Sequence, residues 1–338
     1  MRGHLLIHNP TVIDQTEIDT ALKNNKDVLI QFSEKLYSDE ILSEINRICS
    51  IFDANLTVRF YSIGENFDCS VIEKIPMIKS LTVGSCPAVD HLEVISTLQH
   101  LEKLDISVYE MKETEILNAD NLKDLKSLKV GSTKIKGLNL EYLRSYSQLT
   151  HLVIEEQTKN IRAIGECKNL NHLFLGRISK VPLDFVNELN NLKSLSLLLG
   201  ARPNIHEIKN NNIESLGICW VRGFNDFSNS YNFGRLRRLS IEDQAQLSQL
   251  HFGQPLPELE LLRVSNCKNL TALTGLENLS NLRTMKINKT DVNFEPFIAQ
   301  PLPERLRVID FYTGKMKRDR EIKGLLEKSG YENDPGKR

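Results

Sequence analysis

The chain has 338 residues, of which 40% are hydrophobic and 26% are charged. These proportions are those of an ordinary folded globular protein. Lys and Arg total 43 against 44 for Asp and Glu, which gives a formal net charge of −1. This balance argues against the basic surface of a protein that binds nucleic acid or an anionic membrane.

Six cysteines are spread along the chain without a CxxC pair or a cluster. Their spacing fits neither a disulfide framework nor a zinc site, so we expect reduced and mostly buried thiols. The first ten residues lack the apolar stretch of a signal peptide, and no run of 18 apolar residues occurs. We therefore expect a cytoplasmic protein, with secretion by a signal-less route as the alternative.

The first 54 residues predict an N-terminal α/β capping region. Val28 to Phe32 alternate like a strand, and a short helix is expected from about Thr16 to Leu22. Ser38 can cap a further helix, whose apolar face is formed by Ile41, Leu42, Ile45, Ile48, Cys49 and Phe52. The alternative, a separate functional domain, is less favoured because these residues contain no catalytic constellation.

From residue 78 onward the pattern apolar-x-x-apolar-x-apolar recurs in one register. Eleven clear units begin at Ile78, Leu101, Leu125, Leu149, Leu170, Leu192, Ile213, Leu236, Leu259, Leu282 and Leu306. A degenerate unit lies upstream, with Val58 and Phe60 as its strand residues. Each unit places two inward apolar residues on a short strand, and one strand cannot bury its face alone, so the units must stack.

Stacked units predict a curved parallel sheet on a concave face, with short helical or 3-10 segments on the convex face. The convex apolar residues are more widely spaced, as at Leu92, Ile95 and Leu98 or at Leu270, Leu273, Leu276 and Leu279. Phe224, Phe227, Tyr231 and Phe233 are also expected in this convex core. Residues 55–316 are therefore the predicted repeats of an α/β solenoid.

The repeated motif resembles the leucine-rich-repeat superfamily. The segment LELLRVSNCKNLTALTGLENLSNLRTMKINKTDV, from Leu259 to Val292, looks most like its short-repeat, internalin-like class. The resemblance implies a leucine-rich-repeat solenoid. The superfamily carries Asn or Cys eight residues after the first Leu, where the side chain bonds the backbone of the turn. Only Cys86 and Cys267 fit that slot, so we expect irregular turns.

The C-terminal end predicts a second cap. Asp319 to Ser329 read as a helix that uses Ile322, Leu325 and Leu326 and stops at Gly330. Residues 317–330 are therefore the expected capping helix. Residues 331–338 are polar and are expected to form a frayed tail.

The sequence offers little support for catalysis. No Walker loop, GxGxxG, GxSxG or HExxH motif occurs. His151 and His172 share one position in adjacent units, but zinc needs a third protein ligand, so two exposed His in a binding surface are the favoured interpretation. Cys219 has no His in a neighbouring concave row to act as its base. We expect no enzyme, no cofactor and no metal.

The predicted concave face interleaves charges of both signs, unlike a groove that binds phosphates. An apolar patch of Val153, Phe174, Leu198, Leu199 and Trp220 lies at its centre, although Trp220 could instead belong to the core. Aromatic and Arg anchors with a charged rim are typical of a protein contact. The predicted partner-binding residues are His151, Val153, Glu155, His172, Phe174, Arg177, Leu198, Trp220, Arg238, Glu242, Asp243 and Arg263.

Together these features predict a non-enzymatic scaffold that engages a partner protein on its concave face and is monomeric when free. By its resemblance to small divergent solenoids, the chain looks like a bacterial immunity or inhibitor protein that neutralises a toxin. The alternatives are a signal-less secreted effector that binds host proteins and a cytosolic regulatory adaptor subunit of an enzyme. Neither a nucleic acid nor a membrane is an expected partner.

Overall fold

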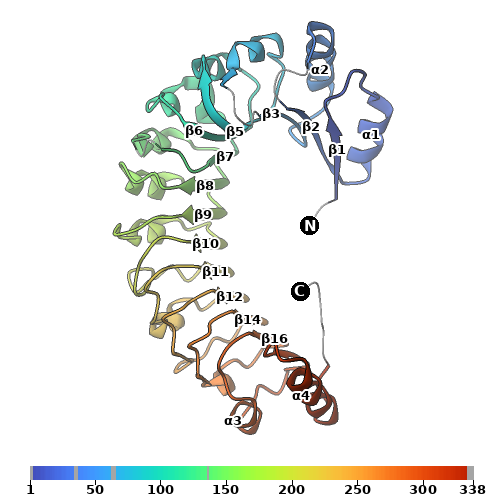
Figure 1. The fold of residues 1–338 in the computed structure, drawn as a ribbon. Coiled ribbons are helices and arrows are strands. Elements are labelled where there is room, and N and C mark those ends of the chain that lie inside the picture. The colour runs from blue at the N-terminus through green and yellow to red at the C-terminus, as the bar shows by residue number, and fades with distance from the viewer. Residues whose placement is uncertain (1–2, 34–36, 62–65, 135–136, 333–338) are drawn as a thin grey trace. The chain divides into compact units, whose positions relative to one another are not determined.

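The computed structural model describes residues 3–33, 37–61, 66–134 and 137–332. The chain divides into two compact units, Met1–Leu170 (unit 1) and Asn171–Arg338 (unit 2). Within each unit, parallel strands stack side by side, and short turns and helices return on one side of them (Figure 1). Among the described residues, no helix has both the length and the apolar character needed to cross a lipid bilayer.

Unit 1 joins two βα elements to the first repeats. Its strands are β1 (His4–His8), β2 (Asp27–Ser33), β3 (Leu56–Tyr61), β4 (Phe67–Asp68), β5 (Ser80–Asp90), β6 (Lys103–Glu110), β7 (Ser127–Val130) and β8 (His151–Glu155). They form a parallel sheet in the order β1-β2-β3-β5-β6-β7-β8, and β4 pairs with the end of β5. The helices are α1 (Gln15–Lys23) and α2 (Asp39–Ile51). The 3-10 turns are η1 (Cys69–Lys74), η2 (Leu92–Thr97), η3 (Ile116–Asn118), η4 (Asp120–Asp124), η5 (Leu140–Ser145) and η6 (Ile161–Glu166).

The helices predicted in the N-terminal region are present. The side chain of Asp14 caps α1 by accepting from the backbone N–H groups of Thr16 and Glu17. Ser38 caps α2, since its Oγ accepts from the N–H of Ile41 at 3.3 Å. The predicted apolar face of α2 is buried, except that Phe52 lies beyond the helix in extended backbone and is half-buried. Strand β1 was not predicted, because it lies at the sheet edge and its apolar residues do not alternate.

Unit 2 contains the remaining repeats. Its main strands are β9 (His172–Gly176), β10 (Ser194–Leu198), β11 (Ser215–Cys219), β12 (Arg238–Glu242), β14 (Leu261–Ser265), β16 (Thr284–Asn288) and β17 (Val308–Tyr312), parallel and paired in that order. A separate two-stranded ladder joins β13 (Gln249–His251) to β15 (Ala272–Thr274). The helices are α3 (Phe294–Ala299) and α4 (Met316–Lys328). The 3-10 turns are η7 (Asp184–Glu188), η8 (Ser228–Asn232) and η9 (Leu276–Asn278).

The repeat register predicted from the sequence is confirmed in every clear unit. Both apolar strand residues are buried throughout, as at Leu195 and Leu197 of β10 or Leu216 and Ile218 of β11. Burying one such side chain stabilises the fold by about 1.5–3 kcal/mol. The residues between them face the opposite side of the sheet, which we call the open face.

The return segments are mostly 3-10 turns, as expected, but one pair of repeats differs. Residues around Leu273 form strand β15 beside β13, so the predicted turn at Leu270 to Leu279 is partly a short parallel ladder. Asn side chains bond the turns of successive repeats. Buried Asn210 donates from Nδ2 to the carbonyl oxygens of Val186 at 2.8 Å and Leu189 at 2.9 Å. These bonds satisfy carbonyl groups that a short turn leaves unpaired.

Three details of the prediction, two in the core and one in the C-terminal tail, are wrong. Phe224, Phe227 and Phe233 are buried, but Tyr231 is 57% exposed on η8. In α4, Ile322 and Leu326 are buried, whereas Leu325 is 44% exposed. Glu332 does not belong to a frayed tail: its N–H donates to the carbonyl oxygen of Arg307 at 2.8 Å. Residues 333–338 of the predicted tail lie outside the described residues.

Candidate functional site

The residue two positions after the second buried apolar residue of the strand motif adopts left-handed backbone in eight repeats. Its φ is between 52° and 63° at Ser85, Glu156, Arg177, Leu199, Trp220, Asp243, Asn266 and Lys289. Such φ values are uncommon outside glycine, with Asn and Asp enriched among the exceptions, and they cost a bulky residue about 1–2 kcal/mol. Within each unit, the chain therefore places these strained residues in a column at the strand ends.

In unit 2 a backbone ladder holds this column in place. The N–H of Leu199 donates to the carbonyl oxygen of Cys219 at 2.9 Å, and that of Trp220 donates to Glu242 at 3.1 Å. Asp243 continues the ladder to Ser265 at 2.9 Å. Each repeat thus fixes the turn of the repeat before it.

Gln244 occupies the slot that the superfamily gives to Asn or Cys, where we expected an irregular turn. Its buried Nε2 donates to the carbonyl oxygens of Ile218 at 3.2 Å and Glu242 at 2.5 Å. In unit 1, buried Gln157 accepts from the N–H of Leu138 at 3.0 Å. The sequence expectation was therefore wrong at these two turns, because the longer Gln side chain still reaches backbone groups.

Trp220 lies at the centre of an apolar edge in unit 2. Its side chain is 59% exposed, so the core interpretation is wrong for this residue. Leu198 and Cys219 are register partners on neighbouring strands, and both are half-buried on the open face. Leu199 and Trp220 follow them directly in the left-handed column. We call Leu198, Leu199 and Trp220 the Trp220 edge.

A polar cavity of about 430 Å³ lies in unit 2 at the strand ends of the following repeats. It is lined by Glu242, Asp243, Arg263, Ser265, Asn266, Asn288, Lys289, Asp310 and Tyr312. Glu242 is oriented by Ser240, whose Oγ donates to its Oε1 at 2.6 Å, and by Arg263 at 3.5 Å. Asn266 donates to the carboxylate of Asp243. The backbone hydrogen bond from Trp220 to Glu242 links the Trp220 edge to this cavity, because Glu242 also lines the cavity.

The predicted unit 2 residues do not all lie together. Phe174 belongs to a row of register partners on the open face, and the next members on the neighbouring strands are Ser196, Gly217 and Ser240. Arg263 is the member of this row on the fourth strand from Phe174, about 19 Å away at the usual spacing between strands. Small side chains therefore separate Phe174 from Arg263. His172 and Arg238 occupy the opposite ends of their strands from Gly176 and Glu242. Of the predicted residues, Leu198 and Trp220 belong to the Trp220 edge, and Arg177 adjoins it through the bond from its N–H to the carbonyl oxygen of Leu198 at 2.7 Å. Glu242, Asp243 and Arg263 line the cavity.

The three predicted residues of unit 1 all lie on β8. His151 is exposed, and Val153 and Glu155 are half-buried on the open face of that unit. His151 Nδ1 lies 2.9 Å from the Oγ1 of Thr150. Arg177 in unit 2 is exposed in the left-handed column. None of the twelve predicted contact residues is buried.

The chemistry of Cys219 does not favour a nucleophile. Burial raises the pKa of its thiol, and the carboxylates of Glu242 and Asp243 raise that pKa further. A thiol with a raised pKa carries little thiolate at neutral pH. Among the described residues, no three His, Cys, Asp or Glu side chains gather as metal ligands.

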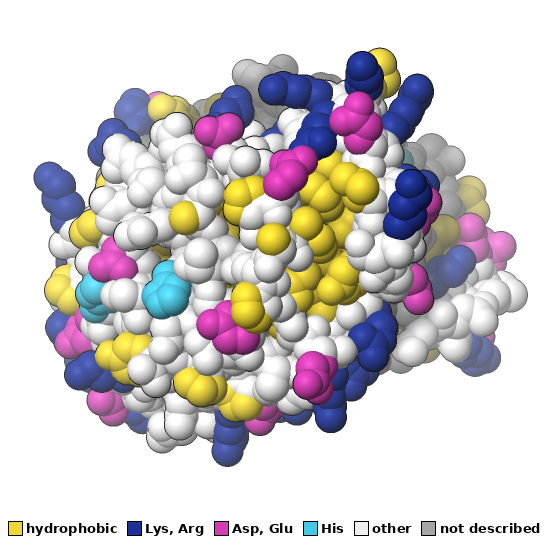
Figure 2. Space-filling view, turned by 90° about the horizontal axis from the view of Figure 1, so that it is seen from below, with side chains coloured by type: hydrophobic (Ala, Val, Ile, Leu, Met, Phe, Trp, Pro, Cys, Tyr) yellow, Lys and Arg dark blue, Asp and Glu magenta, His cyan; other side chains and the backbone are white. Residues whose placement is uncertain are grey.

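Sequence reasoning missed the cavity residues Asn266 and Asn288. Asn266 shares its repeat position with Asp243, and both residue types tolerate left-handed backbone, so an aligned column of such residues could have marked the turn. Figure 2 shows acidic and basic side chains interspersed around a gathering of hydrophobic ones on one face of the molecule. No single sign of charge dominates that face.

Comparisons with known proteins agree with this description. Neither a protein-family model nor a curated protein sequence matches the chain. Among solved structures, the internalin inlF of Listeria monocytogenes is 17% identical, with a TM-score of 0.52 over 81% of this chain and 89% of its own. A leucine-rich-repeat protein of Leptospira interrogans is 18% identical, with a TM-score of 0.48 over 93% of this chain and 90% of its own.

A third similar structure is TLR13 in its complex with ssRNA13, 16% identical with a TM-score of 0.50. That match covers 92% of this chain and 52% of the other. At such identities the likeness concerns the fold alone. The likeness to the internalin, together with the stacked parallel strands and their 3-10 return segments, shows that the chain has the leucine-rich-repeat fold.

Proposed function

We propose that the chain is a protein-binding module whose main contact in unit 2 is the Trp220 edge with the polar cavity. The observation that carries the proposal is Trp220, a 59% exposed indole on a backbone with φ of 52°. Exposure and strain both cost free energy in the isolated chain. A costly aromatic residue on a surface is typical of a binding contact.

The surroundings of Trp220 support a protein partner. Leu198 and Leu199 extend the apolar area, while Arg263 and Glu242 provide a polar rim. An apolar centre with an aromatic anchor, Arg and a charged rim is the usual composition of a protein contact. Interleaved acidic and basic groups disfavour a polyanion, whose phosphates need basic residues as partners.

Capture of partners from the native cell tests the proposal. We expect Trp220→Ala and Leu198→Ala to lose a protein that the wild-type chain retains, because both side chains belong to the Trp220 edge. Tyr231→Ala is the matched control, because Tyr231 is 57% exposed but lies on η8 in the return segments. Circular dichroism would verify that all three variants fold. Retention of every captured protein by the Trp220 and Leu198 variants would refute the contact surface.

For the partner, we favour a toxin that this chain neutralises as a cytoplasmic immunity or inhibitor protein, as its resemblance to small divergent solenoids suggests. A secreted effector would instead capture host proteins, and it would be found in culture supernatant. A regulatory adaptor would capture an enzyme and change its rate. Mass spectrometry of the captured protein distinguishes the three roles.

A further inference from the structure

Arg59 on β3 is a half-buried cation without an acidic partner among the described residues. Its Nε is buried and has no hydrogen-bond acceptor. The guanidinium carbon lies 5.0 Å from the centre of the Tyr61 ring. The hydroxyl of Tyr61 is in turn 3.2 Å from His8 Nε2 on β1. Stacking therefore holds the guanidinium in place, while one of its five N–H donors is unused.

Two described acidic residues, one on β6 and one in the segment before β3, are engaged elsewhere. Asp105, two strands away on β6, pairs with Lys129 at 2.9 Å and accepts from Ser107 at 3.0 Å. Asp53 accepts from the backbone N–H of Asn55 at 2.9 Å. Neither carboxylate neutralises Arg59. A buried polar group without a partner costs about 1–3 kcal/mol, and the penalty is larger for a charged one.

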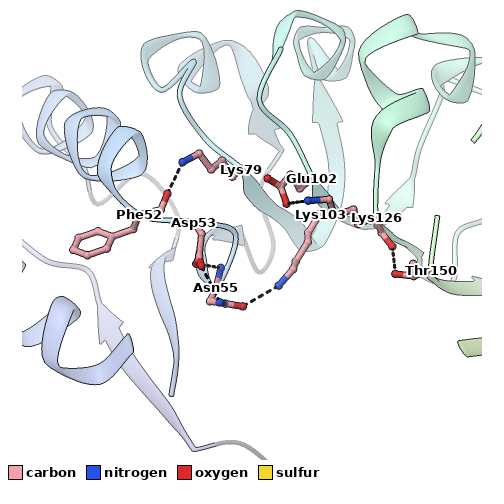
Figure 3. Close-up of polar contacts among 8 residues, drawn as sticks. All are labelled: Phe52, Asp53, Asn55, Lys79, Glu102, Lys103, Lys126 and Thr150. Carbon is pink, nitrogen blue, oxygen red and sulfur yellow. Dashed lines mark hydrogen bonds and ion pairs between the residues drawn. The ribbon is translucent and has the colours of Figure 1, made fainter. Parts of the chain in front are cut away.

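Lys103 supplies a second cation over the same strand. Figure 3 shows its side chain reaching from β6 to Asn55, where Nζ lies 3.5 Å from Oδ1. Among the described residues, Lys103 has no ion pair. Between the two cations, the hydroxyl groups of Thr57 and Ser80 bond each other at 2.8 Å. Asn55 and Arg59 are four residues apart, about 13 Å at the rise of a strand.

We propose that this part of the unit 1 open face binds an acidic peptide segment that lies extended along β3. Two carboxylates four residues apart would meet Lys103 and the outer nitrogens of the Arg59 guanidinium, so that its charge gains an acidic partner. An Arg fork suits a carboxylate because it can donate two parallel hydrogen bonds. Two cations are too few for a nucleic acid, which binds through many phosphates. The site goes beyond the Trp220 edge and is independent of it.

The test uses a synthetic peptide with Glu at its first and fifth positions, and the same peptide with Gln at both. In ¹⁵N-labelled full-length protein, the Nε–H signal of Arg59 is identified by its loss in Arg59→Lys. We expect the Glu peptide to shift that signal and the Gln peptide to leave it. Arg59→Gln should weaken Glu-peptide binding about tenfold, as expected for a lost charge-assisted contact, and Lys103→Gln should weaken it severalfold.

Lys112→Gln is the matched control, because Lys112 is an exposed cation in unit 1 that lies beyond the end of β6. It should leave binding within about twofold, the size of a screened surface-charge effect. Equal weakening by Arg59→Gln and Lys112→Gln would refute a specific site. Inorganic phosphate is the last ligand to be tested. If phosphate shifts the Arg59 signal and the Glu peptide does not, the site accepts a free anion and the peptide proposal is wrong.

Discussion

The backbone N–H of Trp220 donates to the carbonyl oxygen of Glu242 at 3.1 Å, and this bond joins the turn after β11 to the end of β12. It holds Trp220 at a φ of 52°. The same carbonyl oxygen accepts from Gln244 Nε2 at 2.5 Å. One buried Gln side chain thus supports the turn that presents the exposed indole.

Comparing Trp220→Gly with Trp220→Ala separates the cost of the left-handed backbone at residue 220 from the loss of side-chain packing. Gly relieves a left-handed penalty of about 1–2 kcal/mol and adds unfolded-state entropy worth about 0.5–1 kcal/mol. Because the indole is 59% exposed, little packing is lost. We expect Trp220→Gly to leave the free energy of unfolding within about 1 kcal/mol of wild type, and Trp220→Ala to be the less stable variant. Urea denaturation measures both, and a more stable Ala variant would contradict the strain.

Removing the Gln244 side chain should destabilise the fold. Gln244→Ala leaves the carbonyl oxygen of Ile218 without its side-chain donor and creates a cavity at a fully buried position. We expect a loss of about 1–3 kcal/mol in the free energy of unfolding. Gln246→Ala is the control, since Gln246 is exposed, and it should change stability by less than about 0.5 kcal/mol. Equal effects of the two variants would show that the turn does not depend on Gln244.

The strands could be predicted because their buried positions are occupied by apolar residues at a regular spacing in the sequence. Leu216 and Ile218, like their equivalents in every repeat, are apolar at a fixed spacing, and only stacking can bury them. The cap of α2 was predictable too, since Ser38 precedes a helical apolar face and bonds the N–H of Ile41. Both inferences rest on sequence patterns that span only a few residues.

Most of the turns could not be predicted, because their conformation is imposed by the next repeat. Leu199, Trp220 and Asp243 share one left-handed conformation although their side chains have nothing in common. What they share is a backbone bond to the following repeat, and backbone groups carry no sequence signal. The cavity beside Glu242 was missed for the same reason, since its lining comes from four strands.

The Asp68–His91 pair in unit 1 predicts a pH-dependent stability. His91 Nδ1 lies 2.9 Å from Asp68 Oδ1. The pKa of Asp68 is lowered to about 2 by the backbone N–H of Ser70 and then by His91, and Asp68 raises the pKa of His91. The Asp68 contribution is complete above its unfolded pKa of about 3.9 and is lost as pH falls toward 2. The His91 contribution is present below its unfolded pKa of about 6.5 and is lost as pH rises through the raised folded pKa.

The variant His91→Asn tests this pH dependence of stability. Asn is the chosen replacement because it tolerates the left-handed backbone of residue 91, whose φ is 56°. We expect its melting temperature to fall furthest below wild type near pH 5, where both groups are charged, and the gap to narrow near pH 9. High salt should narrow the gap at pH 5 as well, since both side chains are more than half exposed. A gap that does not change with pH would show that packing, not charge, accounts for the loss.

Thiol labelling of the folded protein tests the surface next to Trp220. Cys219 is half-buried on the open face, whereas the other five cysteines are buried. Burial raises the pKa of Cys49 and Cys167 to about 12 and of Cys267 to about 11, so these thiols should not react. We expect iodoacetamide to modify Cys219 first, slowly at neutral pH and faster as the pH rises, with Cys219→Ser removing that labelling. Peptide mapping by mass spectrometry identifies the modified residue. Preferential labelling of a buried cysteine would mean that the repeats open locally before Cys219 reacts.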